Sequence, residues 1–179
     1  MKAGLGIPSL EEQPPSRQAV RAEMEATRIA FHGLLASMTL EDWRRRSVIL
    51  EWTNGQLAAH ILSYVSAVIP RGVRFAQKGK RTAGFPPWLV KTGLADRINV
   101  LSARWIARNL TPASTRAAYD EAHGALLALL EETPEDEWWK STYIFGKQMT
   151  IRELFMSHAR HLEEHLPHVR HDPHLLPTL

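Results

Sequence analysis

The sequence predicts an all-α protein, a four-helix bundle with a long crossover between its second and third helices. Apolar residues repeat every three or four positions in four segments, and Thr caps mark where three of these segments begin. No segment alternates polar and apolar residues over more than a few positions, as a strand would. We expect one bundle domain over residues 16–170, between an irregular N-terminal arm (1–15) and a C-terminal tail (171–179).

The first two helices are predicted from apolar spacing and from a cap. The second helix begins near Thr53, which is expected to form a capping box with Gln56. Its apolar stripe carries His60, and Pro70 with Gly72 is expected to disturb its end. The first helix extends to about Ser37, and its apolar face consists of Val20, Met24, Thr27, Phe31, Leu34 or Leu35, and Met38.

The crossover and the third helix follow from loop residues and a second start signal. Residues 79–93 contain the Gly and Pro residues of a long loop, and a shorter helix is expected over 94–109. The third main helix starts at Thr111 and Pro112 and ends near Glu132. The loop is long enough to return the third helix parallel to the second, which leaves the second and fourth helices antiparallel.

The fourth helix is predicted to begin at Thr150, where Glu153 completes another capping box. It is expected to reach about Arg170, with Pro167 bending or shortening its end because proline removes a backbone donor. Before it, residues 133–149 are expected to be irregular, with a short extended turn near 143–149.

The composition excludes several kinds of site. The 179 residues include no Cys, so the chain cannot form a disulfide scaffold, a Cys-ligated zinc site, an iron–sulfur centre or a Cys nucleophile. Imidazole is the soft metal ligand on offer. Nine His are present, and six of them lie near the C-terminus: His158, His161, His165, His168, His171 and His174.

The charge pattern favours an anionic small molecule over nucleic acid. The net charge is +3, and the segment from Trp52 to Ala95 has no acidic residue but several Lys and Arg. These basic residues lack aromatic interleaving and any known nucleic-acid motif, so no such partner is predicted. No apolar run reaches the length of a membrane span, and no signal segment begins the chain, so we expect a cytoplasmic protein without a membrane partner.

Three histidines are candidates for one metal site. His161 and His165 are four positions apart and share a helix face. At about 1.5 Å per residue, His60 lies roughly 10 Å along the second helix, and the other two lie roughly 16–22 Å along the fourth. Antiparallel packing brings these heights together, whereas an up-down-up-down bundle separates them by roughly 9 Å. A hydrogen-bonded core role for His60, and a solvated role for the HxxxH pair, remain open alternatives.

The other histidines rank lower. His158 is one turn before His161 and is a rival at spacing three, expected to lie in a pocket or beside the ligands. His168, His171 and His174 follow Pro167 and are expected to form a solvated tail. The remaining pair, His32 and His123, look isolated in the sequence.

Three families of metal site do not fit this spacing. His161 to His165 formally matches the HxxEH signature of inverted zinc proteases, with Glu164 as the base, but too few residues follow to supply the further acidic ligand. Ferritin-like di-iron bundles need ExxH elements, and none of the histidines on the fourth helix has Glu three positions before it. Hemerythrin-like carriers need an HxxxE, whereas His60 is followed at that spacing by Tyr64.

Three stretches of the sequence resemble the DinB/YfiT-like superfamily of metal-binding four-helix bundles. Residues 51–61 are similar to the start of its second helix, and residues 150–166 are similar to its fourth, while 96–112 resembles its entry to the third. The resemblance covers about residues 16–170. It implies a bundle with the long crossover, a divalent metal held by His60, His161 and His165, and a homodimer.

A site of three imidazoles predicts a metal-dependent enzyme acting on a small molecule. Three neutral ligands leave the metal its charge and an open position, which is typical of catalytic zinc sites. With zinc or nickel, the expected chemistry is hydrolysis by activated water or transfer to a thiol co-substrate, with detoxification as the expected role. No catalytic residue is assigned; Tyr64, Glu163 and Glu164 are the candidates for a general base. The alternative is a non-catalytic dimeric bundle that binds a metal or another ligand.

Overall fold

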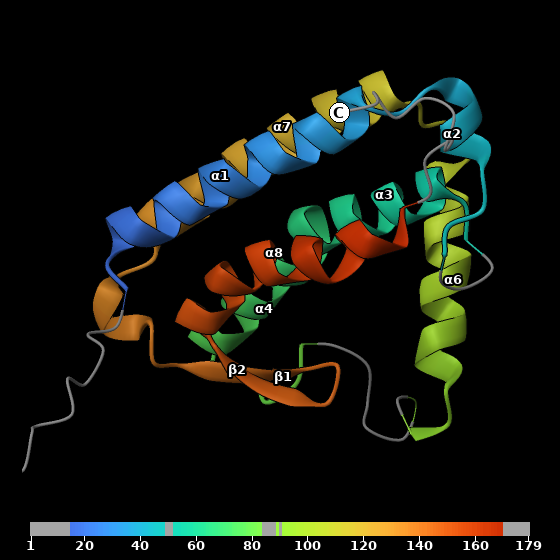
Figure 1. The fold of residues 1–179 in the computed structure, drawn as a ribbon. Helices are drawn as coiled ribbons and strands as arrows, with labels where there is room; N and C mark the ends of the chain where they lie inside the picture. The colour runs from blue at the N-terminus through green and yellow to red at the C-terminus, as the bar shows by residue number, and fades with distance from the viewer. Residues whose placement is uncertain (1–14, 49–51, 84–88, 90, 170–179) are drawn as a thin grey trace, which may run out of the picture.

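The computed structural model describes residues 15–48, 52–83, 89 and 91–169. Four long helical segments lie side by side and form the bundle (Figure 1). The predicted arm and tail fall almost wholly outside the described residues. The bundle segments are α1 (Arg17–Ala36), α3 (Asn54–Ser63) continued by the π-helix η1 (Tyr64–Val68) and α4 (Ile69–Gln77), α7 (Pro112–Glu132) and α8 (Ile151–His165).

The directions of these helices confirm the predicted crossover. In Figure 1, α3 and α7 run the same way, whereas α1 and α8 run the opposite way. The crossover contains α6 (Leu94–Ala107), which stands steeply to the bundle axis and packs against α3. Because the crossover returns α7 parallel to α3, α8 lies antiparallel to α3, and the two helices contact each other.

The starts of the helices are fixed locally, as the sequence predicts. The hydroxyls of Thr53, Thr111 and Thr150 each accept a hydrogen bond from the backbone three residues ahead. Each cap is reciprocal, because a side chain at that third position bonds the cap's backbone N–H. α8 ends at His165 and a 3-10 turn (Leu166–His168) follows, so Pro167 shortens the helix as expected.

The second helix is disturbed just before Pro70, as the sequence predicts, but it continues past this residue to Gln77. The π-helical turn η1 precedes Pro70, and the N–H of Ile69 bonds the carbonyl of Tyr64, five residues back. A wider turn relieves the clash that a proline ring makes with the preceding turn of an α-helix. The wider turn also keeps one set of buried residues, spaced four apart, facing the core. In a regular α-helix, residues at this spacing would turn gradually away from the core. The set is Leu57, Ile61, Val65, Ile69 and Val73.

A short helix missed by the sequence reading supports the start of α3. In α2 (Leu40–Arg44), the buried indole of Trp43 donates a hydrogen bond to the carbonyl of Leu110, 3.1 Å away, just before α7. The same ring lies so close to Gly55 that a Cβ there would be 2.5 Å from it. Gly55 thus permits the close approach of α2 and α3.

A β-hairpin replaces the expected extended turn before α8. β1 (Ser141–Ile144) and β2 (Lys147–Thr150) pair antiparallel, with Ser141 opposite Thr150. The two-residue turn between them has positive φ at both Phe145 and Gly146, as a tight hairpin requires. The hairpin contacts α4, where Gly72 lets the Ile144 side chain approach the helix.

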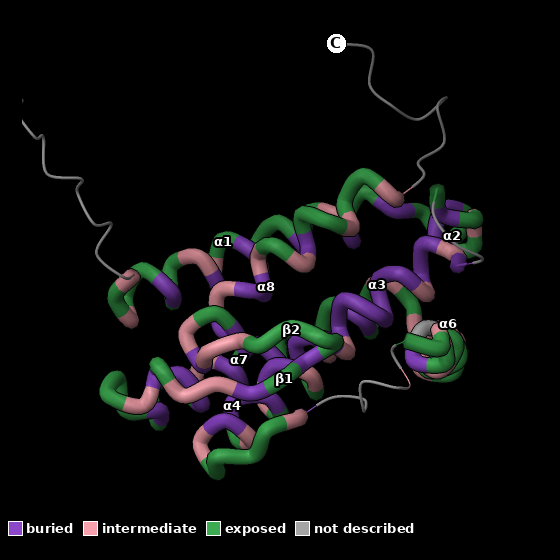
Figure 2. The backbone as a smooth tube through the Cα atoms, turned by 90° about the horizontal axis from the view of Figure 1, so that it is seen from below, coloured by how far each residue is buried: buried purple, intermediate pink, exposed green. Residues whose placement is uncertain are grey.

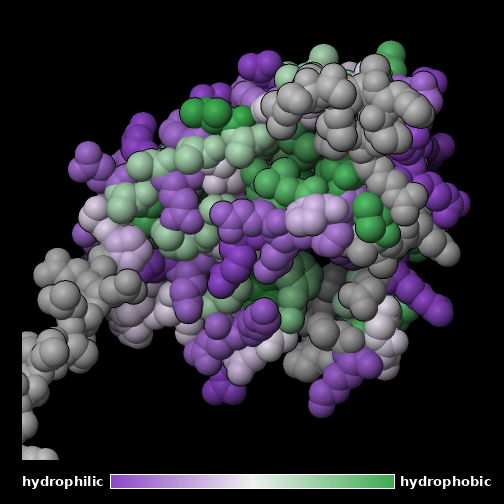
Figure 3. All heavy atoms as spheres, in the orientation of Figure 1, coloured by the Kyte–Doolittle hydropathy of each residue, from purple (hydrophilic) through white to green (hydrophobic). Residues whose placement is uncertain are grey.

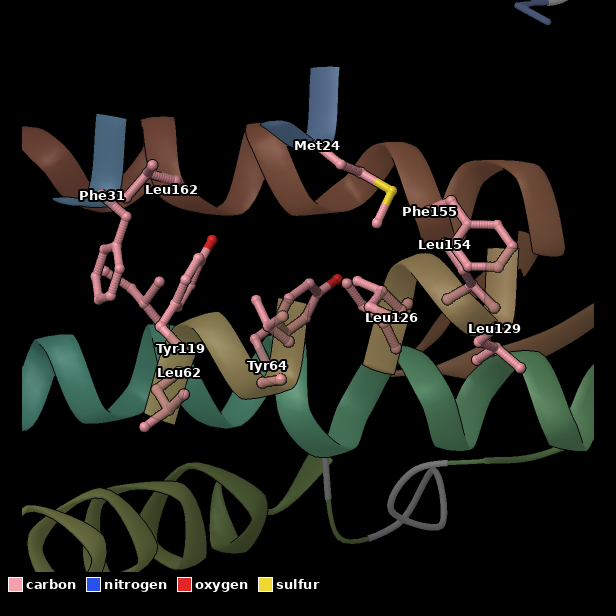
Figure 4. Packing of buried hydrophobic residues seen from close by; sticks show 14 of the residues in the cluster. Met24, Phe31, Leu62, Tyr64, Tyr119, Leu126, Leu129, Leu154, Phe155 and Leu162 are labelled. Carbon is pink, nitrogen blue, oxygen red and sulfur yellow. The ribbon is translucent and has the colours of Figure 1, made fainter. Parts of the chain in front are cut away.

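The core lies between α1, α4, α7 and α8. Buried residues concentrate on the inward faces of the helices in Figure 2, which also shows α6 end-on beside α3. Figure 4 shows Met24 and Phe31 of α1 meeting residues of α7 and α8. The rings of Phe31 and Tyr119 are 4.4 Å apart at their centroids, and both side chains are inaccessible to solvent.

Candidate metal centre

His60, His161 and His165 meet where α3 and α8 pack together. Each offers one ring nitrogen, and these three atoms all lie within 4.8 Å of one another, so the group could hold a metal ion. The ring centroid of His60 is 4.9 Å from that of His161 and 5.0 Å from that of His165, and the two histidines of α8 are 4.6 Å apart. Antiparallel packing therefore brings together the residues that the sequence singles out.

The donor set fits a divalent cation. One buried nitrogen on each ring has no hydrogen-bond partner among the described residues: Nδ1 of His60, Nε2 of His161 and Nδ1 of His165. Buried polar atoms without a partner are costly, and a metal ion is one means of satisfying them. Borderline cations such as zinc favour neutral imidazole ligands.

Burial keeps these imidazoles neutral. Burial, and next the charge of neighbouring histidines, lowers the pKa of His60 to about 4 and that of His161 to about 2. The pKa of His165 is also lowered, mainly by burial and then by His168. A neutral ring keeps the lone pair that a metal ligand needs.

Neighbouring side chains hold two of the rings. Tyr64 of η1 stacks on His161, with centroids 3.9 Å apart and an interplanar angle of 19°. The buried Tyr64 hydroxyl donates to Ser157 Oγ, 3.0 Å away. The ring centroid of Trp52 is 5.0 Å from that of His60. A hydrogen bond between the His60 ring and the Asn99 side chain of α6 partly opposes the lowering of the pKa of His60.

His60 and His161 border a cavity of about 460 Å³ between α8, η1, α6 and the hairpin. This volume is in the range of sites for small molecules. Its wall combines His60 and His161 with residues of each of these elements: Tyr64, Ala95, Asn99, Ile144, Phe145, Lys147, Gln148, Met149, Glu153, Ser157, Arg160 and Glu164.

Two of the three candidate bases line this cavity. Tyr64 and Glu164 line the cavity, and Glu163 does not. The charge of Glu163 instead helps to raise the pKa of Glu23 on α1. Burial raises the pKa of Tyr64, so this hydroxyl stays protonated at neutral pH. Tyr64 is therefore a hydrogen-bonding group and not a base.

Comparison with known proteins gives the family of this fold and site. The family model of the DinB superfamily matches residues 13–169. The chain belongs to the DinB superfamily. No curated protein sequence matches it.

Two solved structures share the fold of this DinB chain. They are the mycothiol-dependent maleylpyruvate isomerase, with a TM-score of 0.67, and a point mutant of that enzyme, with a TM-score of 0.66. Each is 16% identical to this chain and matches 87% of it. The DinB chain spans 61% of the length of either structure.

A second group of histidines lies inside the DinB bundle, away from the cavity wall. His158, 2% exposed, pairs through Nε2 with the Tyr119 hydroxyl between α8 and α7. It does not line this cavity, but its charge helps to lower the pKa of His161. His123 and His32, which look isolated in the sequence, have acidic partners on the facing helix. The nitrogen–oxygen distances are 3.1 Å for His123–Glu25 and 3.0 Å for His32–Asp120.

The C-terminal histidines are only partly described. The ring of His168 lies 5.8 Å from that of His165, and its carbonyl accepts a hydrogen bond from Val48 N–H. His168 is thus half-buried against the domain, which differs from the expected solvated position. His171 and His174 lie outside the described residues.

The acid-free segment does not supply the positive charge of the cavity. Arg71, Arg74, Lys78 and Lys80 are exposed on and just after α4, and none of them lines the wall. The cations that line the wall are Lys147 of β2 and Arg160 of α8. Over the described part of the chain, no helix is long and apolar enough to cross a bilayer.

Proposed function

We propose that this DinB protein is a metal-dependent enzyme acting on a small molecule, with zinc or nickel held by His60, His161 and His165. The observation that carries the proposal is the convergence of three neutral imidazoles, each with a buried unpartnered nitrogen, beside a cavity. When bound, a divalent ion with three imidazole ligands supplies a Lewis acid that lowers the pKa of a water or thiol.

The chain's own residues prepare the site for such chemistry. The pKa values of the three histidines are lowered, so no proton competes with a cation for their nitrogens at neutral pH. Tyr64 fixes the plane of the His161 ring by stacking on it. Its hydroxyl stays protonated and donates a hydrogen bond to Ser157 Oγ. Glu164, on the exposed side of the cavity, is the remaining candidate for accepting a proton.

Both reaction types expected from the sequence remain in the proposal. The chain has no Cys, so in the S-transferase type the thiol enters as a co-substrate. The fold is shared with an enzyme described as mycothiol-dependent, which supports the thiol type. In the hydrolase type the site activates water against a reactive small molecule, and in either type we infer a role in detoxification.

Metal analysis of untagged protein tests the centre. We expect the wild type to carry about one zinc or nickel per chain and a His60→Ala/His161→Ala double variant to carry none. His168→Gln, which removes a nearby imidazole outside the group, is the matched control and retains the metal. Equal trace metal in the wild type and the double variant would contradict the centre.

A screen with metal-stripped protein as control separates the reaction types. Turnover of strained electrophiles without an added thiol supports the hydrolase type. Turnover that requires an added thiol supports the transferase type.

The alternative function is a non-catalytic bundle that forms a dimer or binds another ligand. It predicts that added Zn²⁺ or Ni²⁺ leaves the melting temperature unchanged, whereas an ion that binds only the folded state raises it. We also propose that the protein is a homodimer, which light scattering on the purified protein tests. The proposed location is the cytoplasm, which cell fractionation tests.

A further inference from the structure

Two cations on the cavity wall have no acidic partner among the described residues. Arg160 of α8 precedes His161, and Lys147 begins β2 on the hairpin side of the cavity. Neither side chain makes a salt bridge within 4.0 Å or a side-chain hydrogen bond to any residue that the structure describes. Cations on helix surfaces commonly pair with an acid four residues away, yet Arg160 forms no ion pair with Glu164.

Arg160 lies near two other groups of the cavity wall. Its charge partly opposes the rise that burial causes in the pKa of the Tyr64 hydroxyl, and it helps to lower the pKa of the Glu153 carboxylate. Both groups line the cavity, and Glu153 is nearly two turns before Arg160 in α8. This direction agrees with the lean of helical side chains toward the N-terminus.

The two carboxylates of the wall equal the two cations in number, but neither forms an ion pair with Arg160 or Lys147 within 4.0 Å. Glu153 Oε2 accepts hydrogen bonds from the Thr150 N–H and Oγ1 at 2.7 and 2.8 Å, so it serves the N-terminal cap of α8. Glu164 lies one turn beyond Arg160, toward His165. Hydrophilic side chains gather along this side of the molecule in Figure 3, and apolar residues show between α8 and α1.

We propose that Arg160, assisted by Lys147, binds a carboxylate of the small molecule that occupies the cavity beside His60 and His161. The proposal rests on the proposed function, and it names the substrate class: a thiol or hydroxyl compound that carries a carboxylate. A guanidinium matches a carboxylate with two parallel hydrogen bonds, which fixes orientation as well as position.

Binding of two matched pairs of probes tests this assignment. The first pair is mercaptoacetate and mercaptoacetamide, which share a thiol and differ in the carboxylate. The second pair, glycolate and glycolamide, replaces the thiol by a hydroxyl. Each is titrated into the protein loaded with Co²⁺, and binding is followed by the visible bands of the cobalt and the near-ultraviolet band of a cobalt-bound thiolate.

We expect the wild type to bind at least one carboxylate probe about tenfold more tightly than its amide. This ratio corresponds to about 1.4 kcal/mol of binding free energy. Arg160→Gln abolishes most of this preference and leaves the affinity for the amide within about twofold. Arg160→Lys restores part of it, because the charge remains without the fork. Arg74→Gln removes an equal charge from an exposed position of α4 outside the cavity and keeps the wild-type preference.

Failures of the subsite and of the centre are distinguishable. If Co²⁺ gives no visible band in the wild type, the metal centre is refuted, and the subsite defined beside it is refuted too. If the band appears but the carboxylate preference is absent, unchanged in Arg160→Gln, or equally reduced in Arg74→Gln, the subsite alone is refuted. A preference seen only with the glycolate pair supports the subsite and contradicts the thiol type of reaction.

Discussion

The phenol ring of Tyr64 lies nearly parallel to the imidazole of His161, with centroids 3.9 Å apart, and joins the π-helical turn η1 to α8. The hydroxyl of the same tyrosine bonds Ser157, one turn before that histidine. Ser157 Oγ in turn donates to the Leu154 carbonyl at 2.6 Å. One side chain thus holds both the ring of a candidate ligand and the helix that carries it.

Two substitutions separate the roles of the Tyr64 ring and hydroxyl. Tyr64→Phe keeps the stack and loses one hydrogen bond, so the free energy of unfolding should fall by about 1 kcal/mol with little change in metal affinity. Tyr64→Ala leaves His161 unsupported and should weaken metal binding about tenfold or more, as loss of outer contacts does at other centres. Competition titrations with a chelator measure the affinity. Equal affinities of the two variants would contradict a positioning role for the ring.

The pair formed by Tyr119 and His158 should contribute to stability. Both side chains are buried, and Figure 4 shows Tyr119 pointing from α7 toward α8. Tyr119→Phe leaves Nε2 of His158 without its hydrogen-bond partner and should cost about 1–3 kcal/mol in urea unfolding. Tyr143→Phe removes a hydroxyl from a residue that is 45% exposed and should stay within about 0.5 kcal/mol of the wild type. A loss no larger at Tyr119 than at Tyr143 would show that the buried bond is unimportant.

His158 should make the stability of the metal-free protein depend on pH. Burial, and next the charge of His123, lower its pKa from 6.5 to about 4. Between these values the unfolded chain binds more protons than the folded one, so this contribution is complete above pH 6.5 and is lost as the pH falls toward 4. Urea titrations of the wild type should therefore show a steeper loss than His158→Gln, by at most about 1.4 kcal/mol per pH unit. Parallel profiles for the two proteins would argue against a neutral, buried His158.

Two glycines within helical segments should respond oppositely to alanine. At Gly72 a Cβ would lie 2.5 Å from Ile144 Cδ1 and 3.1 Å from a methyl of Leu154, so Gly72→Ala should destabilise by about 1–3 kcal/mol. At Gly124, in α7, a Cβ meets nothing within 4 Å, and Gly124→Ala should stabilise by up to about 1 kcal/mol. Thermal or urea unfolding of both variants checks the pair. A stable Gly72→Ala protein would mean that the hairpin can move away from α4.

The helix starts and the crossover could be predicted because their causes are local. Thr53 and Thr150 cap their helices with partners three residues ahead, which are visible in the sequence. The long segment before Thr111 limits the directions that the helices can take. From these directions follows the meeting of His60 with the histidines of α8.

What the sequence could not predict depends on contacts between distant segments. The helix continues past Pro70 because η1 widens the turn, and the burial of apolar residues on both sides of this turn stabilises that geometry. The hairpin has a largely polar β2, so its strands show little alternation. His123 and Glu25 lie on different helices, and only the register of α1 against α7 reveals that they are partners.

The positions of His60 and His165 also bear on how the folded chain holds together. They belong to an early and a late helix, with the whole crossover and α7 between them. An ion shared by the two would close a very long loop, and the entropy removed from partly unfolded forms grows with loop length. In a chain without cysteine, such an ion would act as a reversible cross-link, so that depletion of the metal would weaken the packing of α8 against α3.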